Sequence, residues 1–168
     1  MTQKEIPGLG DGVYRVLFVC TGNICRSPTA EAVFRHLTDQ AGLSSSIGID
    51  SAGTHDYHVG DPPDSRSVAA ARTRGFDMST LRARKVRRDD FQTFDLILAM
   101  DSDHHAHLVA LRPNDAKAEI RLFLEYHPEK RVRDVPDPYY GGPEGFMNVL
   151  DLVEAASANL LAEIKRGL

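Results

Sequence analysis

The stretch from Val16 to Pro28 constrains the fold of this chain more than any other. It begins with an apolar run, residues 16–19, then come Cys20, five further residues and Arg26, and a helical pattern starts at Ser27-Pro28. A loop of this length can turn successive backbone N–H groups inward and so bind an anion. The N-terminus of the following helix would add its positive end at the same point. The stretch therefore predicts a strand, an anion-binding loop and a helix in direct succession.

Strand and helix patterns alternate along the rest of the chain. Short apolar runs predict strands at residues 14–19, 47–53, 94–100 and 120–123. Apolar residues at helical spacing, with glycine and proline at the ends, predict helices at residues 28–41, 63–74, 102–111 and 146–164. This alternation indicates parallel strands joined by right-handed crossovers, with ligands bound beyond the carboxyl ends of the strands. Cys20 would lie at such an end. Residues 82–88 are basic and are expected to form an exposed connection.

The composition is typical of a soluble globular protein of one domain. Of the 168 residues, 42% are hydrophobic and 26% are charged. A net charge of −4, without a long Lys/Arg run, argues against a nucleic-acid partner. Because the N-terminus has no apolar signal core and no stretch approaches bilayer length, we expect no membrane span and a cytoplasmic protein. Residues 1–13 contain a proline and three glycines, which predicts a flexible extension before a domain at residues 14–168.

Both cysteines of the chain, Cys20 and Cys25, lie in the predicted loop. Two cysteines five positions apart do not form the disulfide framework of a secreted protein, so a reactive or redox role is favoured. Free thiols are most often buried and inert. The turn-forming and charged residues after Cys20 argue instead for a nucleophile, since a helix N-terminus and a guanidinium favour the thiolate. Cys25 is either a small packing residue or the partner of Cys20 in a reversible, protective disulfide.

Arg26 and Ser27 add the other groups that phosphoryl transfer needs. The planar guanidinium of Arg26 can hold two oxygens of a phosphoryl group and stabilise their charge. Attack of Cys20 on a phosphoester would give a thiophosphate, which water then hydrolyses. Ser27 can serve as the helix N-cap, as a hydrogen-bond donor to the departing thiolate, or as both. The loop therefore predicts phosphoryl transfer through sulfur.

Breaking a phosphoester also requires an acid that protonates the leaving group. Asp137 is the best candidate, because Pro136 and Pro138 hold its backbone rigidly; the alternative is an ordinary Asp-Pro turn. Tyr139 and Tyr140 follow directly. They either wall a slot for an aromatic ring or pack the loop against the C-terminal helix.

A histidine cluster lies near the third predicted strand. His104, His105 and His107 follow Asp101 and Asp103, and such a group could suggest a metal site. Their spacing matches no known arrangement of metal ligands. We expect instead a solvated first helical turn, capped by residues 101–103, and no metal.

Two motifs resemble those of low-molecular-weight protein-tyrosine phosphatases. The segment Cys20-Thr21-Gly22-Asn23-Ile24-Cys25-Arg26-Ser27-Pro28 resembles the signature of this family, and this motif is highly specific. Asp137-Pro138-Tyr139-Tyr140 matches the acid motif that the family carries towards the end of its chain. Residues 50–54, 60–64 and 94–101 resemble the family as well. The resemblance extends from Val16 to the C-terminus without a large insertion.

The resemblance implies a single α/β domain of three layers, a flavodoxin-like fold with a four-stranded parallel sheet and helices on both faces, and no metal or organic cofactor. It implies Cys20 as nucleophile, Arg26 as phosphate clamp and Asp137 as general acid and then base. The implied phosphate- and substrate-binding residues are Thr21, Gly22, Asn23, Ile24, Cys25, Ser27, Ser51, Tyr57, Tyr139 and Tyr140. Asn23 and Ser51 would hold the loop in shape and Tyr57 would line the substrate slot. Cys25 would be the redox-protective partner of Cys20.

Two positions mark differences from relatives. Many members carry a histidine after the second helix that bonds the loop asparagine, but residues 78–84 contain none, so the support of Asn23 is open. Related bacterial enzymes that act on phosphoarginine carry a threonine where this chain has Ile24. A branched apolar side chain suits a flat aromatic ring better than a guanidinium. Phosphotyrosine is therefore favoured over phosphoarginine.

The sequence thus predicts a phosphotyrosine phosphatase that binds phosphate or vanadate and is a monomer or a weak dimer. Its partner would be a phosphotyrosine-containing protein, for which family analogy offers a bacterial tyrosine kinase. A protein arginine phosphatase is the first alternative. A thiol-dependent arsenate reductase ranks lower, because that chemistry needs cysteines beyond Cys25. A phosphotyrosine-binding module without turnover also ranks lower, because Cys20, Arg26 and Asp137 are all present.

Overall fold

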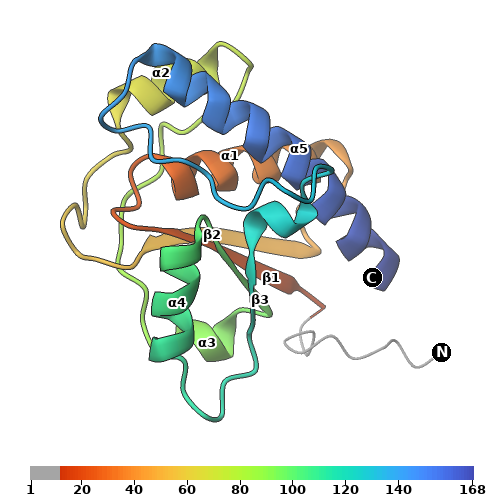
Figure 1. The fold of residues 1–168 in the computed structure, drawn as a ribbon. Helices are drawn as coiled ribbons and strands as arrows, with labels where there is room; N and C mark the ends of the chain where they lie inside the picture. Colours follow the sequence, from red (N-terminus) through yellow and green to blue (C-terminus); the bar gives the residue numbers. More distant parts are fainter. Residues whose placement is uncertain (1–11) are drawn as a thin grey trace.

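The computed structural model describes residues 12–168, so only the last two residues of the predicted extension, residues 1–13, fall within it. Four strands form one parallel sheet in the order β2-β1-β3-β4 (Figure 1). The strands are β1 (Tyr14–Cys20), β2 (Ile47–Gly53), β3 (Leu96–Ala99) and β4 (Glu119–Leu122). The predicted four-stranded parallel α/β sheet is confirmed.

Helices cover both faces of this sheet. Within the described residues they are α1 (Arg26–Gln40), α2 (Ser65–Arg72), α3 (Asp90–Thr93), α4 (Ser102–Leu111), the short 3-10 helix η2 (Phe123–Tyr126) and α5 (Pro143–Gly167). In Figure 1, α1, α2 and α5 lie on one side of the sheet, whereas α3 and α4 lie on the other. The three layers that the sequence predicts are therefore present.

Strand β1 is apolar along most of its length because both of its faces are covered. Val16 and Phe18 lie in the core formed with α1 and α5, whereas Leu17 and Val19 lie in the core formed with α3 and α4. All four side chains are fully buried. Burial on both faces is typical of parallel sheets and gives a continuous apolar run rather than an alternating one. The carboxyl end of β1, where Cys20 lies, is therefore held firmly.

Some element boundaries differ from the predicted ones. Helix α1 begins at Arg26 with Cys25 in the cap position, so the predicted N-cap role of Ser27 is wrong. Strand β3 begins at Leu96, and a carboxylate oxygen of Asp95 before it accepts a hydrogen bond from the backbone N–H of Arg15 at 2.8 Å. Helices α3 and η2 were not predicted, since a helix of four residues is too short to show a periodic pattern.

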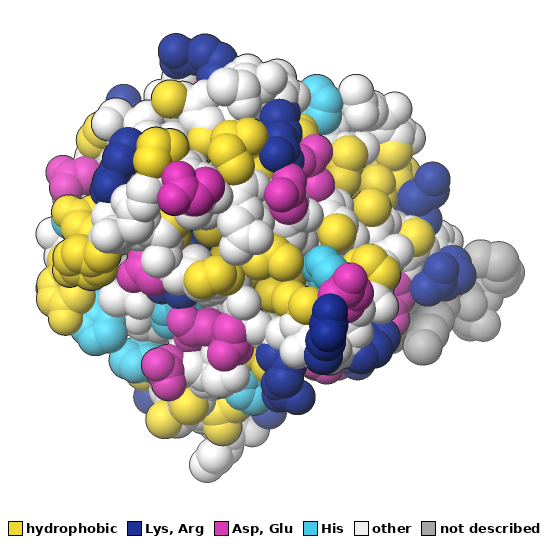
Figure 2. All heavy atoms as spheres, turned by 45° about the horizontal axis from the view of Figure 1, so that its top comes forward, with side chains coloured by type: hydrophobic (Ala, Val, Ile, Leu, Met, Phe, Trp, Pro, Cys, Tyr) yellow, Lys and Arg dark blue, Asp and Glu magenta, His cyan; other side chains and the backbone are white. Residues whose placement is uncertain are grey.

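Charges are mixed on the molecular surface. On the face shown in Figure 2, acidic and basic side chains are interspersed rather than gathered by sign. Such a face is not the electrostatic footprint of a nucleic-acid-binding protein. Across residues 12–168, none of the helices is both long and apolar enough to cross a membrane.

Candidate active site

The loop between β1 and α1, residues 20–26, depends on one residue with a left-handed backbone. Asn23 has a φ of 59°, and among residues 12–168 it is the one non-glycine residue with a positive φ. Asparagine tolerates this conformation better than most residues. A β-carbon on the adjacent Gly22 would lie 2.9 Å from the imidazole of His58. The loop leads into the N-terminus of α1, where backbone N–H groups lack partners within the helix. This arrangement suits an anion.

Cys20 lies at the floor of this loop. Its thiol is buried, and its Sγ lies 3.0 Å from the Oγ of Ser27. Because Asn23 Nδ2 donates to that Oγ at 2.7 Å, the hydroxyl hydrogen of Ser27 is left for the sulfur or for the more distant carbonyl oxygen of Ala52. Ser27 therefore contacts the thiol from within the first turn of α1.

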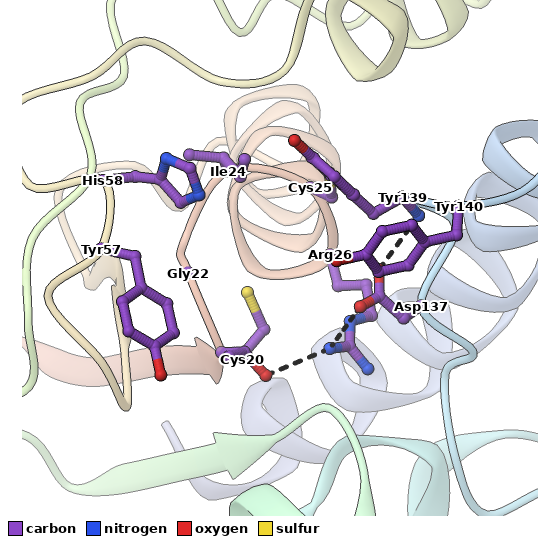
Figure 3. A pocket seen from close by; sticks show the side chains of 11 residues that line it. Cys20, Gly22, Ile24, Cys25, Arg26, Tyr57, His58, Asp137, Tyr139 and Tyr140 are labelled. Atoms are coloured by element: carbon purple, nitrogen blue, oxygen red, sulfur yellow. Dashed lines mark hydrogen bonds and ion pairs between the residues drawn. The ribbon is translucent and has the colours of Figure 1, made fainter.

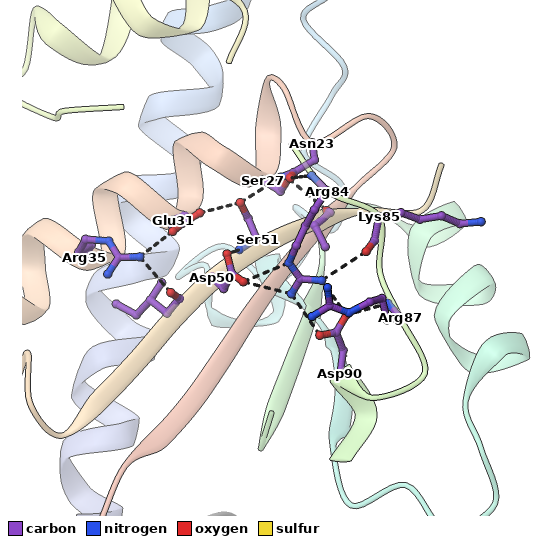
Figure 4. A network of polar contacts seen from close by, with 12 residues as sticks. Asn23, Ser27, Glu31, Arg35, Asp50, Ser51, Arg84, Lys85, Arg87 and Asp90 are labelled. Atoms are coloured by element: carbon purple, nitrogen blue, oxygen red, sulfur yellow. Dashed lines mark hydrogen bonds and ion pairs between the residues drawn. The ribbon is translucent and has the colours of Figure 1, made fainter. Parts of the chain in front are cut away.

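The side chain of Asn23 is held on three sides (Figure 4). Its Nδ2 donates to Ser27 at 2.7 Å and to the Oγ of Ser51 at 2.9 Å, and its Oδ1 accepts from the backbone N–H of Arg84 at 3.0 Å. Ser51 in turn donates to the buried carboxylate of Glu31 at 2.7 Å. A backbone N–H thus supports Asn23 where many relatives are expected to use a histidine. No sequence pattern pointed to Glu31 or Arg84 as a support of the loop.

We call residues 82–88 the strap, and the predicted exposure holds for only part of it: Arg82, Lys85, Arg87 and Arg88 are exposed, whereas Arg84 is half-buried. Ala83 and Val86 are buried. The Arg84 side chain forms ion pairs with Asp50 at 3.1 Å and with Asp90 at 2.9 Å, and Asp90 is only 2% exposed. Backbone hydrogen bonds between the strap and the end of β2 hold the strap against the sheet.

Arg26 is buried beside Cys20, and its two terminal nitrogens have different partners. Nη1 donates to a carboxylate oxygen of Asp101 at 2.8 Å and to the carbonyl oxygen of Val135 at 3.1 Å. Nη2 lies 3.4 Å from the Oγ1 of Thr21 and 3.8 Å from a carboxylate oxygen of Asp137. Nη1 is therefore fixed by the protein, while Nη2 faces the loop and Asp137.

Asp137 lies at the edge of the site, with its side chain 48% exposed. Its Oδ1 accepts from the backbone N–H of Tyr139 at 3.0 Å, so Asp137 forms a local turn and its carboxylate also faces the Arg26 guanidinium. Arg66 holds this loop. Its Nη1 donates to the Tyr139 carbonyl oxygen at 3.0 Å. The central carbon of its guanidinium lies 5.2 Å from the ring centre of Tyr139 and 4.8 Å from that of Phe146. Its Nε and Nη2 donate to the carboxylate of Asp64. Nothing in the sequence pattern singled out Arg66.

These groups line one pocket of about 230 Å³ (Figure 3). Its lining consists of Cys20, Thr21, Gly22, Ile24, Cys25, Arg26, Tyr57, His58, Asp137, Tyr139 and Tyr140. Of the residues predicted for the site, Asn23, Ser27 and Ser51 lie behind the loop instead of on the pocket wall. The tyrosines form an aromatic rim, with Tyr57 68% and Tyr140 92% exposed. His58 also lines this pocket, although no sequence pattern indicated it.

The predicted solvation of the histidine cluster is wrong for one member. His104 is buried, because Asp101 caps α4 and turns its first residues towards the loop. Burial lowers the pKa of His104 to about 4, and the positive charge of Arg26 is the second-largest cause of this shift. Among the described residues, no group of three or more His, Cys, Asp or Glu side chains is placed to hold a metal ion.

Cys25 lines the same pocket as Cys20, and both are free thiols. Burial raises the pKa of the Cys25 thiol to about 12. Cys25 is therefore protonated at neutral pH and is a poor nucleophile there. The disulfide between the two residues stays a prediction.

Comparison with known proteins gives one consistent result. A model of the family described as low molecular weight phosphotyrosine protein phosphatase matches residues 15–168. The chain is 45% identical over 155 residues to a low molecular weight protein-tyrosine-phosphatase of Streptomyces coelicolor, and the match covers 90% of this chain and 94% of that protein.

Solved structures share the fold. A protein tyrosine phosphatase from Entamoeba histolytica, with Hepes in the active site, superposes with a TM-score of 0.88 at 40% identity, covering 92% of this chain and 98% of the other. DARP, a Drosophila arginine phosphatase, superposes with a TM-score of 0.83 at 31% identity, covering 89% of this chain and 97% of the other.

Proposed function

The chain belongs to the low molecular weight phosphotyrosine protein phosphatase family, and from this premise we propose that it hydrolyses phosphotyrosine in proteins through a cysteinyl-phosphate intermediate. One observation carries the proposal. Cys20, Arg26 and Asp137 line the same pocket, with Arg26 only 3.8 Å from the Asp137 carboxylate. A nucleophile, a cation and a proton donor thus face one space in which a phosphoryl group can sit.

In the first step, the thiolate of Cys20 attacks phosphorus. A sulfur–phosphorus bond forms, the bond from phosphorus to the phenol oxygen breaks, and that oxygen leaves with the electron pair. Asp137 gives it a proton, since an unprotonated leaving group departs slowly. Arg26 and the loop N–H groups hold the other phosphoryl oxygens and stabilise their charge.

In the second step, water attacks the phosphorus of the cysteinyl phosphate. Asp137, now ionised, takes the proton of this water. The new oxygen–phosphorus bond forms as the sulfur–phosphorus bond breaks, and the electron pair returns to Cys20. The hydroxyl of Ser27, 3.0 Å from the sulfur, donates to the departing thiolate and so lowers its basicity. Inorganic phosphate then leaves.

The walls of the pocket support an aromatic substrate. Tyr57, Tyr139 and Tyr140 surround its mouth, and Ile24 adds an apolar surface next to the loop. Rings stack or pack edge-on against such surfaces, whereas a guanidinium would leave polar N–H groups without partners.

The likeness to an arginine phosphatase makes phosphoarginine the second candidate. A panel of phosphotyrosine, phosphoserine and phosphoarginine peptides separates the two, and faster turnover of phosphoarginine would reverse the ranking.

The variant Cys20→Ser tests the nucleophile. We expect it to hydrolyse no aryl phosphate, because a serine hydroxyl is hardly ionised at neutral pH, and to keep its affinity for inorganic phosphate, because Arg26 and the loop remain. Release of 4-nitrophenol and binding calorimetry measure the two properties. Full activity of this variant without added metal would overturn the proposal. Phosphate binding without turnover by the wild type would favour a binding module.

Cys25 is proposed to protect the nucleophile. A disulfide between Cys20 and Cys25 would stop oxidation before the irreversible sulfinic acid forms. After a pulse of peroxide and then a thiol reductant, the wild type should regain activity, whereas Cys25→Ser should stay inactive. Equal recovery of the two proteins would remove this role.

A further inference from the structure

A buried histidine that the proposed mechanism does not use lies against the phosphate clamp. His104, in the first turn of α4, is 4% exposed. Its Nε2 lies 2.7 Å from the Oγ1 of Thr21 and 3.5 Å from the Nη2 of Arg26. Its Nδ1 lies 3.0 Å from Asp101, the carboxylate that also holds Nη1 of the same guanidinium. One imidazole thus contacts the loop, the clamp and the counter-ion of the clamp.

One arrangement of protons fits all of these distances. Arg26 carries hydrogens on Nη2 and can only donate, so Nε2 of His104 must present its lone pair. The Thr21 hydroxyl then donates to Nε2 and accepts from Arg26 at 3.4 Å. The remaining ring hydrogen is on Nδ1, which is buried 3.0 Å from a carboxylate oxygen of Asp101 but does not meet hydrogen-bond geometry with it. His104 is therefore neutral, as expected for an imidazole that is buried beside a guanidinium.

A neutral acceptor suits the chemistry of the Nη2 end. Asp101 already balances the charge of Arg26 from the Nη1 side. Asp137 already lies 3.8 Å from Nη2, so a further carboxylate in the place of the imidazole would compete with the negative oxygens of a phosphoryl group, and a cation there would push the guanidinium away. Imidazole and hydroxyl groups instead orient Nη2 through one of its two hydrogens and leave the other available for a charge-assisted bond to the ligand.

Helix α4 has little need of this imidazole for its own stability. Asp101 caps the helix by accepting from the backbone N–H of His104 at 2.9 Å, a contact that any residue except proline can make at this position. Leu108 anchors the same helix in the core. The side chain of His104 therefore points its polar atoms at the site without being required as a cap.

We propose that His104 is a positioning residue, which together with Thr21 sets the orientation of the Arg26 guanidinium for phosphoryl oxygens. This inference rests on the proposed function of Arg26 as the phosphate clamp. His104 acts through Arg26 and Thr21 and does not touch the reacting atoms.

Substitution by leucine and by glutamine separates orientation from packing. His104→Leu fills the buried space but has no acceptor, whereas the amide of His104→Gln can reach the position of Nε2. For the leucine variant we expect the affinity for inorganic phosphate and kcat/KM for 4-nitrophenyl phosphate to fall together, by about tenfold or more, the usual effect of losing one hydrogen bond to a charged group. The glutamine variant should lie within about threefold of wild type. His105→Ala, one residue along the same helix, is the matched control and should change neither value.

A double-mutant cycle tests the partnership with Thr21. Thr21→Val removes the hydroxyl between Nε2 and Nη2, so the effects of Thr21→Val and His104→Leu on phosphate affinity should overlap instead of multiplying. Independent effects would assign the two residues to separate roles and would contradict the proposal.

Thermal unfolding of each variant identifies a purely structural role. A leucine variant that unfolds earlier but binds phosphate like wild type would overturn the proposal, and so would a glutamine variant as weak as the leucine variant. Failure of the proposed function gives a different result. In that case the wild type itself would not hydrolyse aryl phosphates, while the phosphate affinities would still report on the geometry of Arg26.

Discussion

Asn23 has a backbone conformation that few side chains adopt, and its surroundings explain why it persists. Left-handed backbone costs free energy for a residue with a β-carbon. Here the side chain makes three hydrogen bonds, to Ser27, Ser51 and the backbone of Arg84. Because the loop cannot relax without breaking all three, the N–H groups beyond Asn23 are held ready for an anion. Such preorganisation costs no rearrangement during the reaction.

The variant Asp137→Asn tests the proton donor at the scale of one residue. An amide cannot protonate the leaving oxygen, so we expect kcat/KM to fall by about a hundredfold or more for aryl phosphates with poor leaving groups. Activated esters such as 4-nitrophenyl phosphate should lose less, because their leaving groups need little protonation. The measurement is a plot of log kcat/KM against the pKa of the leaving phenol, which should be steeper for the variant.

Asp134→Asn is the matched control for this experiment. Asp134 is exposed in the same loop and accepts hydrogen bonds from Ser102, away from the pocket. Its replacement should leave the plot unchanged. An unaltered slope for Asp137→Asn would take Asp137 out of the role of acid.

At the scale of elements, the strap between α2 and α3 supports the loop from behind. Its backbone pairs with the end of β2: Gly53 donates to the Arg84 carbonyl oxygen at 2.8 Å, and Val86 donates to the Gly53 carbonyl oxygen at 2.8 Å. The Arg84 guanidinium, between Asp50 and Asp90, holds the strap at this depth. The backbone N–H that supports Asn23 therefore depends on an ion pair on the other side of the strap.

Replacing Arg84 by methionine should destabilise the protein and loosen the loop. Asp90 is 2% exposed, and an unpaired buried carboxylate costs on the order of 3 kcal/mol. We expect a loss of about this size in the free energy of unfolding by urea, and a lower phosphate affinity because Asn23 loses part of its support. The double variant Arg84→Met with Asp90→Asn removes the unpaired charge and should regain much of the stability. If Arg84→Met alone kept wild-type stability and phosphate affinity, the strap would have no role in supporting the loop.

At the scale of the whole molecule, the sheet order brings distant segments together. Strand β1 lies between β2 and β3, so the segments after these three strands meet at one edge of the sheet. They supply Cys20 and Arg26, then Tyr57, then Asp101 and His104. The loop with Asp137 is added from the chain before α5. The site therefore forms only when the entire domain has folded.

The stability of the whole domain should depend on pH through His104. Its pKa is about 4 in the folded protein against an ordinary 6.5, so between these values the unfolded chain binds the proton and the folded protein does not. Stability should therefore rise as pH increases from 4 to 6.5 and be lost as pH falls through this window, by up to about 3 kcal/mol.

The variant His104→Gln has no group that titrates at this position, so its stability should change less with pH. Denaturation by urea at a series of pH values measures the difference. Groups around His104, namely Arg26, Asp101, Asp137 and His107, are the same in both proteins, and their contributions largely cancel. Parallel pH profiles for the two proteins would show that folding does not lower the pKa of His104 and would contradict this prediction.

The sequence by itself determined the features that depend on local order. The apolar runs, the loop from Cys20 to Arg26 and the Asp137 motif were all readable because each is a short pattern of neighbouring residues. The four strands and their parallel direction followed from the alternation of such patterns. These predictions gave the sheet, the loop and Asp137, which lines the same pocket as Cys20.

Only the tertiary structure decided which polar side chains are buried and what they contact. His104 and Arg84 lie in segments that look solvated in sequence, yet packing brings them to Arg26 and Asn23, more than 60 positions away. Arg66 likewise holds Tyr139 from 73 positions away. Burial of a polar group depends on a partner supplied by a distant segment. No local pattern carries that information, so the supports of the site appeared only with the fold.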